Sequence, residues 1–307
     1  MEPGVVRYVV TPGLAGRRLD QGLAALSGLS RRRVRVIVGE GRVWVNQGPH
    51  RVLSRALEVG DVIDVLPGEE TLRPGPPPPD ALTFLYEDPW LLALDKPYGL
   101  ATQPPARRQP GELTVHERAL ILVALRDGRR PELLLFHRLD RLTTGVLVLA
   151  RNHDAARSLA AAWEAGQARK RYLALVDGDP GDGERLVEGP VGRDLLVPGK
   201  YRVTGRGKPA RSRVRRLATT GAYSLVEVRP LTGRTHQVRV HLAHLGSPVA
   251  GDTLYGGSDT VPRPFLHAWR LALPHPTSAR VIELCSPVPP DMTAMAHTLG
   301  LQAPELD

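Results

Sequence analysis

Two polar segments of the chain carry residue types that could perform chemistry. The first, residues 136–145, reads Phe-His-Arg-Leu-Asp-Arg-Leu-Thr-Thr-Gly, so the carboxylate of Asp140 lies between Arg138 and Arg141 just before an apolar run. Cations within about 4–6 Å keep a carboxylate ionised, and an ionised carboxylate can act as a nucleophile or a base. The same pattern fits a structural salt bridge or a cap, and residue types alone leave both interpretations open.

The second polar segment, residues 233–241, reads Gly-Arg-Thr-His-Gln-Val-Arg-Val-His. Polar and apolar residues alternate in it, which predicts a half-buried strand with Arg234 and Arg239 on opposite faces. A core strand rarely carries so many polar side chains unless some of them face a site. The histidines raise the option of a metal site, but His236 and His241 would point away from each other in a strand, so we expect no metal there.

Other kinds of catalytic site are excluded by what the sequence lacks. No glycine-rich phosphate loop is followed by Lys-Ser or Lys-Thr, no dinucleotide fingerprint follows a strand, and no Gly-x-Ser-x-Gly elbow occurs. The single cysteine, Cys285, excludes an intramolecular disulfide and a multi-cysteine metal site, and its apolar neighbours predict a buried strand. The sequence therefore offers no recognisable motif for a bound nucleotide cofactor or a multi-cysteine metal site.

The composition favours a globular protein with a polyanionic partner. The 307 residues suggest two domains, and 42% apolar and 24% charged residues are ordinary globular usage. The formal net charge is +9, from 41 Lys and Arg against 32 Asp and Glu, which favours nucleic acid. No apolar run approaches the roughly 18–20 residues of a membrane span, and the N-terminus does not resemble a signal peptide. We expect a soluble, cytoplasmic monomer that does not bind membranes.

A proline-rich segment divides the chain. Residues 67–80 include Pro-Gly-Pro-Pro-Pro-Pro, which predicts an extended, semi-rigid linker between a small domain (1–66) and a large one (81–307). The small domain is expected to have an αβ fold, with helices at 17–26 and 31–38, the second capped by Ser30, and strands at 42–46 and 62–65.

The small domain is strongly basic. Arginines clearly outnumber acidic residues between Gly16 and Leu66, and Arg31, Arg32 and Arg35 share one helix. A basic helix beside a small sheet suits contact with nucleic-acid phosphates. A solvated charged face is the alternative, but the helix contains no compensating acid.

The large domain mixes strands and helices without regular βαβ repetition, which favours an α+β fold. Residues 193–216, rich in Arg, Gly and Lys, form either a second RNA-contacting stretch or a long β-connection. A helix is expected at 154–165, and strands at 83–88, 90–95, 145–150, 171–176, 224–228 and 237–241.

Both domains resemble known RNA-binding families. The small one is similar to the S-four-type RNA-binding domain at residues 18–20, 30–31, 41–46 and 59–61. The large one is similar to the RluA family of RNA pseudouridine synthases, through ordered motifs at residues 95–99, 137–145, 170–174, 233–242 and 251–256. This resemblance implies a mixed, mainly antiparallel sheet flanked by helices, and the cofactor-free isomerisation of uridine in RNA.

The resemblance also implies roles for single residues. Asp140 would be the catalytic carboxylate and Arg239 its charge partner, while Tyr172 would stack on the base and could act as general base at C5. Arg138 would fill the gap left by the flipped uridine. The remaining RNA-contacting candidates are His137, Arg234, His236 and Gln237.

The sequence leaves the RNA target open. The domain pair resembles enzymes that act on large-subunit (23S) ribosomal RNA, and a tRNA-directed synthase is the alternative. A non-catalytic ribosome-assembly factor is a second alternative, although Asp140, Tyr172 and Arg239 are all present. A methyltransferase would need a glycine-rich cofactor loop, and a DNA-binding regulator would need a dimeric recognition helix.

Overall fold

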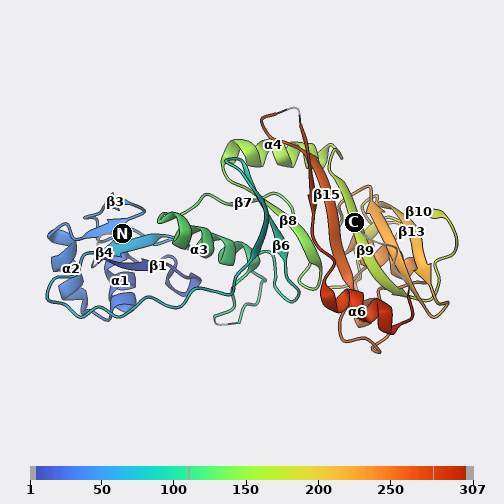
Figure 1. Ribbon diagram of the computed structural model, residues 1–307, viewed down its shortest axis with the longest axis horizontal. Helices are drawn as coiled ribbons and strands as arrows, with labels where there is room; N and C mark the ends of the chain where they lie inside the picture. The colour runs from blue at the N-terminus through green and yellow to red at the C-terminus, as the bar shows by residue number, and fades with distance from the viewer. Residues whose placement is uncertain (1–4, 110, 279, 302–307) are drawn as a thin grey trace. The chain divides into compact units, whose positions relative to one another are not determined.

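The computed structural model describes residues 5–109, 111–278 and 280–301 (Figure 1). Contacts between residues divide the chain into two compact units. The first unit comprises Met1–Leu82 and Ala101–Leu134, and the second comprises Thr83–Leu100 and Leu135–Asp307. The division of the chain at the proline-rich linker stays a prediction, because the contacts also assign a later segment to the first unit.

The first unit contains a small sheet with the strand order β1-β4-β2-β3. Its apolar core includes Tyr8, Leu23, Ile37 and Ile63, each fully buried. The predicted helices and strands are confirmed, and Ser30 caps the second helix by accepting the backbone N–H of Arg33. The elements are β1 (Val6–Val9), α1 (Leu19–Ser27), α2 (Arg31–Gly39), β2 (Val43–Val45), β3 (Gly48–Pro49) and β4 (Val62–Val65), with a 3-10 turn at Pro12–Leu14.

A longer helix, α3 (Val115–Asp127), completes the first unit. A capping box between Thr114 and Glu117 begins it, and Gly128 ends it in the left-handed conformation. Its residues Ile121 and Ala124 pack against β1 and β4, which is why the contacts place it with the small sheet.

The proline-rich segment has no helix or strand, as predicted, but its first half is not a free spacer. The Tyr8 hydroxyl donates to the Arg73 carbonyl at 2.7 Å, and the Glu70 carboxylate pairs with Arg42 at 2.6 Å. Leu72 packs against the core of the first unit. These contacts hold residues 70–73 against the first unit.

The second unit is built on a ten-stranded sheet of the described residues, with the path β10-β13-β14-β9-β15-β8-β6-β5. It is mixed and mainly antiparallel, as expected, with a parallel pairing between β15 and β8. The strands are β5 (Thr83–Glu87), β6 (Leu91–Lys96), β7 (Leu134–Leu135), β8 (Thr144–Ala150), β9 (Arg169–Asp177), β10 (Glu184–Glu188), β13 (Arg211–Thr219), β14 (Tyr223–Pro230), β15 (Leu266–Pro274) and β16 (Val281–Cys285), and β11 (Val191–Arg193) pairs with β12 (Tyr201–Val203) in a separate hairpin.

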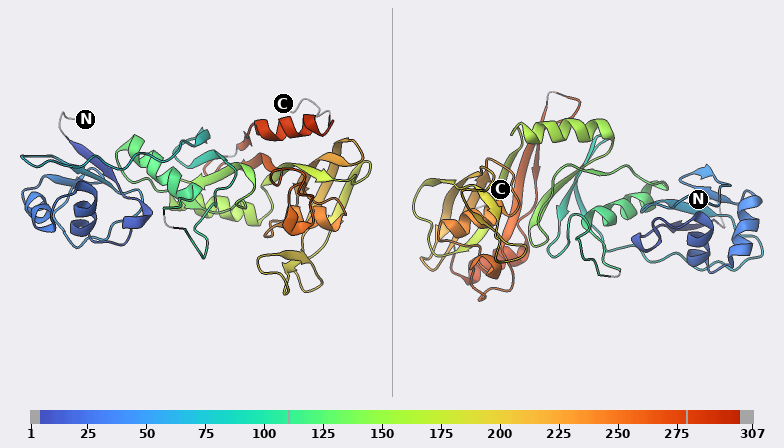
Figure 2. Two further views of the ribbon diagram at one scale, coloured as in Figure 1. Left: turned by 90° about the horizontal axis from the view of Figure 1, so that it is seen from below. Right: turned by 180° about the vertical axis from the view of Figure 1, so that it is seen from behind.

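Helices α4 (His153–Glu164), α5 (Gln237–His244) and α6 (Pro290–Thr298) accompany the sheet, and a 3-10 turn spans Thr253–Tyr255 (Figure 2). Strand β8 is buried along its whole length, which its continuous apolar run predicted. Where β8 begins, Gly145 has a φ of +111°, and a Cβ there would lie 2.2 Å from the Ala268 carbonyl oxygen. Only glycine allows β8 and β15 to meet directly after the Asp140 segment.

Two structural expectations for the second unit are wrong. Residues 237–241 form the first part of helix α5, not a strand. Nearly all of α5 is buried, including Gln237, Arg239 and His241, so its polar residues do not mark an exposed face. Cys285 does lie on a strand, but it is exposed, because it shares a face of β16 with the exposed residues Val281 and Glu283, while Leu284 points inward.

Candidate active site

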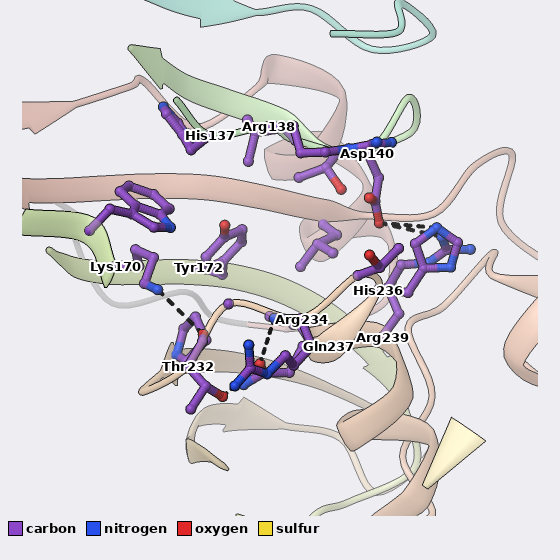
Figure 3. A pocket seen from close by; sticks show the side chains of 18 of the residues that line it. His137, Arg138, Asp140, Lys170, Tyr172, Thr232, Arg234, His236, Gln237 and Arg239 are labelled. Atoms are coloured by element: carbon purple, nitrogen blue, oxygen red, sulfur yellow. Dashed lines mark hydrogen bonds and ion pairs between the residues drawn. The ribbon is translucent and has the colours of Figure 1, made fainter. Parts of the chain in front are cut away.

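A cavity of about 280 Å³ in the second unit gathers most of the predicted site residues (Figure 3). Most of its walls come from the loop before β8, the start of β9, the turn after β14 and the start of α5, and Trp163 of α4 and Leu266 of β15 complete them. Its aromatic, charged and polar lining includes Phe136, His137, Arg138, Asp140, Trp163, Lys170, Tyr172, Thr232, Arg234, His236, Gln237 and Arg239.

A buried lysine, Lys96, holds the loop that carries Asp140 through hydrogen bonds to backbone carbonyls. Lys96 Nζ donates to the carbonyl oxygens of Pro97 at 2.8 Å and Arg141 at 3.2 Å, and the Gly99 amide donates to the same Arg141 carbonyl at 3.1 Å. Burial lowers the pKa of Lys96 to about 7, although the charge of Asp140 opposes this shift. The segment 95–99 therefore positions the loop, a role that the sequence analysis did not assign to it.

Asp140 faces two cationic or titratable partners across the cavity (Figure 3). Its Oδ2 lies 3.6 Å from Arg239 Nη1 and 3.7 Å from His236 Nε2. These separations are longer than hydrogen bonds, so the carboxylate is held by the charge of Arg239 and keeps lone pairs free. Because its side chain is 18% exposed, a ligand in the cavity can reach it.

Arg239 is fixed by a second carboxylate that sequence reasoning missed. Asp252 accepts two hydrogen bonds from the Arg239 guanidinium, at 2.6 Å to Nε and 2.8 Å to Nη2, and both side chains are buried. The guanidinium also lies 4.7 Å from the centre of the Tyr255 ring. Burial works against the charge, but the hydrogen bonds that Arg239 donates to Asp252 raise the pKa of Arg239. The motif at 251–256 contained the signal, since it holds both Asp252 and Tyr255.

His236 enters the site through an unusual backbone conformation. It precedes α5 with a φ of +57°, which non-glycine residues rarely adopt. This conformation lets Nδ1 share a hydrogen bond of 2.8 Å with the Tyr255 hydroxyl, while Nε2 faces Asp140. Burial lowers the pKa of His236 despite the charge of Asp140. The ring is therefore neutral at physiological pH and supplies a polar contact to Asp140.

Tyr172 lies on β9 with its ring toward the same cavity (Figure 3). Burial, together with the nearby charge of Asp140, raises the pKa of the Tyr172 hydroxyl above its usual value. The phenol is then protonated at neutral pH. An aromatic ring in this position suits stacking on a planar ligand, and a neutral phenol is a poor free base.

Arg138 and His137 are neighbours with opposite surroundings. Arg138 is exposed and makes no hydrogen bond or ion pair with the described part of the chain. His137 is buried, accepts the Val148 amide hydrogen at Nε2 over 2.9 Å, and stacks on Trp163 at 4.4 Å between ring centres. Burial lowers the pKa of His137 to about 3. Its geometry therefore suits support of the loop, whereas Arg138 is free to meet a ligand.

Gln237 and Arg234 also differ in what they can bind. The Gln237 amide accepts from Thr232 at 2.8 Å and from the Arg234 amide at 3.0 Å, and donates to the Arg211 carbonyl at 2.9 Å. With these bonds made, Gln237 shapes the turn before α5. The Arg234 side chain is exposed and donates to the Pro209 carbonyl at 3.0 Å through Nε, which leaves its outer nitrogens available.

The predicted basic residues of α2 belong to the first unit. Arg31 pairs with Asp20 at 2.9 Å, and Arg35 reaches the same carboxylate at 3.5 Å. The compensating acid therefore comes from α1, which the absence of acids within α2 had concealed. Arg32 is exposed and has no ion pair with a described residue.

The comparisons with known proteins agree on one family. A sequence model described as "RNA pseudouridylate synthase" matches residues 91–244. A ribosomal large subunit pseudouridine synthase D of Nitrosomonas europaea is 34% identical over 96% of this chain and 88% of its own length. An uncharacterized RNA pseudouridine synthase of Chloroflexus aurantiacus is 38% identical over 95% of this chain and 92% of its own.

Solved structures show the same likeness in the fold. Human RNA pseudouridylate synthase domain containing 4 superposes with a TM-score of 0.61 at 27% identity, over 73% of this chain and 95% of that one. Human RNA pseudouridylate synthase domain containing 1 gives a TM-score of 0.56 at 25% identity, over 73% of this chain and 97% of that one. No helix of the described residues is long and apolar enough to cross a membrane.

Proposed function

The chain belongs to the RNA pseudouridylate synthase family, and on that premise we propose that it converts specific uridines of large-subunit ribosomal RNA to pseudouridine. The ribosomal target is supported by relatives that are named ribosomal large subunit pseudouridine synthases D and C, both 34% identical to this chain. Such a substrate would place the enzyme in the cytoplasm, where ribosomes assemble.

The observation that carries the proposed mechanism is the partly exposed carboxylate of Asp140, held between Arg239 and His236. In the reaction the bond from ribose to N1 of uracil breaks, the base rotates, and a bond to C5 forms, so no atom is gained from a co-substrate. An ionised carboxylate can assist by attack or by proton abstraction. The Arg239 guanidinium, held by Asp252, lies 3.6 Å from the Asp140 carboxylate and orients it by charge attraction.

A uridine must leave its stack to reach Asp140. The cavity of about 280 Å³ is at the small end of ligand pockets, which suits one nucleoside. Tyr172 would stack on the flipped uracil, and the unpaired Arg138 would occupy the vacated place among the bases. His137 and Gln237 would support the walls of the cavity, while Arg234 and His236 would be close to the bound nucleotide.

The first unit would add affinity for RNA. We propose that residues 1–66 act as an S-four-type RNA-binding domain, joined through residues 67–80 to a catalytic domain at 81–307. Arg32 is its clearest phosphate contact, because Arg31 and Arg35 are partly neutralised by Asp20.

Mapping of pseudouridine tests this proposal. The purified protein is incubated with unmodified large-subunit ribosomal RNA, and separately with unmodified tRNA transcripts. Pseudouridines are then located by carbodiimide-dependent stops of reverse transcription. New stops in ribosomal RNA are expected. Stops in tRNA alone would contradict the ribosomal target, and RNA binding without stops in either RNA would favour a non-catalytic assembly factor.

A further inference from the structure

A second cavity, of about 620 Å³, lies in the second unit beside the catalytic pocket. Lys170 and Pro230 line both cavities, which makes the two direct neighbours. Its charged lining consists of six cations and a single carboxylate. They are Arg169, Lys170, Arg171, Arg213, Arg229 and Arg270, with Glu283. We call this cavity the basic cavity.

A buried carboxylate close to the basic cavity fixes two of its arginines, Arg171 and Arg229, together with Arg215, which does not line the cavity. Glu227 is 1% exposed and accepts hydrogen bonds from Arg171 at 2.8 Å, Arg215 at 2.8 Å and Arg229 at 2.5 Å. The three arginines come from three adjacent strands, β9, β13 and β14. Burial opposes the charge of Glu227, but the three hydrogen bonds lower its pKa to about 2. One negative charge thus organises three positive ones, and a positive excess remains.

Two further arginines of the basic cavity leave donors uncommitted. The Arg270 guanidinium stacks on the Trp269 ring at 4.2 Å and makes no hydrogen bond or ion pair with the described part of the chain. Its Nε is buried, so its outer nitrogens are the donors open to a ligand. Arg213 is 50% exposed, and among the described residues its guanidinium pairs with Glu184 alone, at 2.5 Å through Nη1. Fixed guanidiniums with free N–H groups match the bidentate geometry that phosphate accepts.

We propose that the basic cavity binds backbone phosphates of the nucleotides that flank the uridine in the catalytic pocket. This inference rests on the proposed function, since it takes RNA as the occupant. Because Lys170 and Pro230 line both cavities, nucleotides that flank a uridine bound in the first come within reach of the second. Cations spread over several strands suit successive phosphates, whereas a single small anion would use only a few of them.

The test measures RNA binding in an Asp140→Asn background, so that turnover does not enter. Arg213→Gln and Arg270→Gln are combined and compared with the matched pair Arg157→Gln and Arg280→Gln, two exposed arginines outside both cavities. The cavity pair should weaken binding about tenfold or more, and the matched pair much less. The slope of log affinity against log salt should fall by about 1.5–2, the value for two lost phosphate contacts.

A shortened RNA identifies the nucleotides concerned. When the flanks of the bound RNA are trimmed stepwise on either side, the penalty of the cavity pair should disappear once the contacted nucleotides are gone. The double variant Arg213→Lys and Arg270→Lys should retain most of the slope of log affinity against log salt. That result would attribute the effect of the glutamine variants to lost charge and not to misfolding. Thermal unfolding of every variant provides the control for folding.

Three results would overturn the inference. The cavity pair could bind RNA as tightly as the matched pair, or keep the full salt slope, or lose the same affinity on fully trimmed RNA. In those cases the proposed function would stand. If the Asp140→Asn protein bound no RNA at all, both the inference and the proposed function would fail.

Discussion

The buried pair of Arg239 and Asp252 yields the sharpest prediction about how the pocket works. Asp252→Asn keeps the side-chain shape and removes the charge that accepts two hydrogen bonds from a guanidinium only 7% exposed. Removing one partner of a buried ion pair costs about 3–5 kcal/mol of the free energy of unfolding. At about 2–4 °C per kcal/mol for a domain of this size, Tm should fall by roughly 6–20 °C.

Turnover should fall as well. Arg239 Nη1 lies 3.6 Å from Asp140 Oδ2, and it would move onto Asp140 once its other partner is neutral. A displacement of about 1 Å at a catalytic group can cost about a hundredfold in rate, so we expect a loss of that order in kcat. Single-turnover release of tritium from C5 of labelled uridine in the target RNA measures the rate, and circular dichroism follows unfolding.

A second arginine–aspartate pair in the same unit provides a matched control. Arg263 donates to Asp291 at 2.6 and 2.7 Å and is also 7% exposed, but Asp291 is 57% exposed and lines neither cavity. Asp291→Asn also leaves a buried guanidinium without its charged partner and should lower the free energy of unfolding, but it should leave kcat unchanged because Asp291 lines neither cavity. Equal losses of kcat in the two variants, or an unchanged Tm in Asp252→Asn, would refute this explanation of the pocket.

Three further predictions concern other parts of the molecule. The pKa of Lys96 is lowered from 10.5 to about 7, so between these pH values the unfolded chain binds more protons than the folded protein, and the free energy of unfolding rises with pH. In urea unfolding, Lys96→Met should reduce this rise by about 1 kcal/mol per pH unit. An unaltered dependence on pH would contradict the burial argument. Because burial raises the pKa of Tyr172, its phenol stays protonated and does not act as a base, so turnover should not increase tenfold per pH unit between about pH 7 and 9. A tenfold increase per pH unit that Tyr172→Phe abolishes would show that a phenolate acts as the base. Arg32→Gln should weaken RNA binding and lower the salt slope by about 1 with an unchanged Tm, whereas Arg31→Gln should have a smaller effect on binding; equal binding by Arg32→Gln and the unaltered protein would count against the first unit as an RNA contact.

Local sequence signals predicted most of the elements. Ser30 before a run of helix formers, and the apolar run at 145–150, each depend on neighbouring residues only, and both predictions are confirmed. Helix α5 was misread because its polar residues find partners from distant segments, such as Ser212 for His241 at 2.9 Å. An argument from periodicity cannot detect such partners, because it assumes that polar residues face water.

The composition of the site was predictable in part. Motif resemblance supplied Asp140, Tyr172 and Arg239, and the structure brings all three to one cavity. The supporting residues Lys96 and Asp252 were missed, because a charged side chain in sequence carries no sign that the fold will bury it. In α2 the sequence carries no sign of a pairing that the fold creates. Arg31 and Arg35 have no acid on their own helix, but both pair with Asp20 of α1.

The central claim is that Asp140 performs the isomerisation, and one measurement tests it most directly. Tritium release from C5 of uridine is followed under single-turnover conditions for the unaltered protein, for Asp140→Asn, and for Asp154→Asn, which neutralises an exposed aspartate on α4. RNA affinity is measured alongside. We predict release by the unaltered protein and by Asp154→Asn, and none by Asp140→Asn although it still binds RNA. Release by Asp140→Asn at a rate near that of the unaltered protein would contradict the assignment of Asp140 as the catalytic carboxylate.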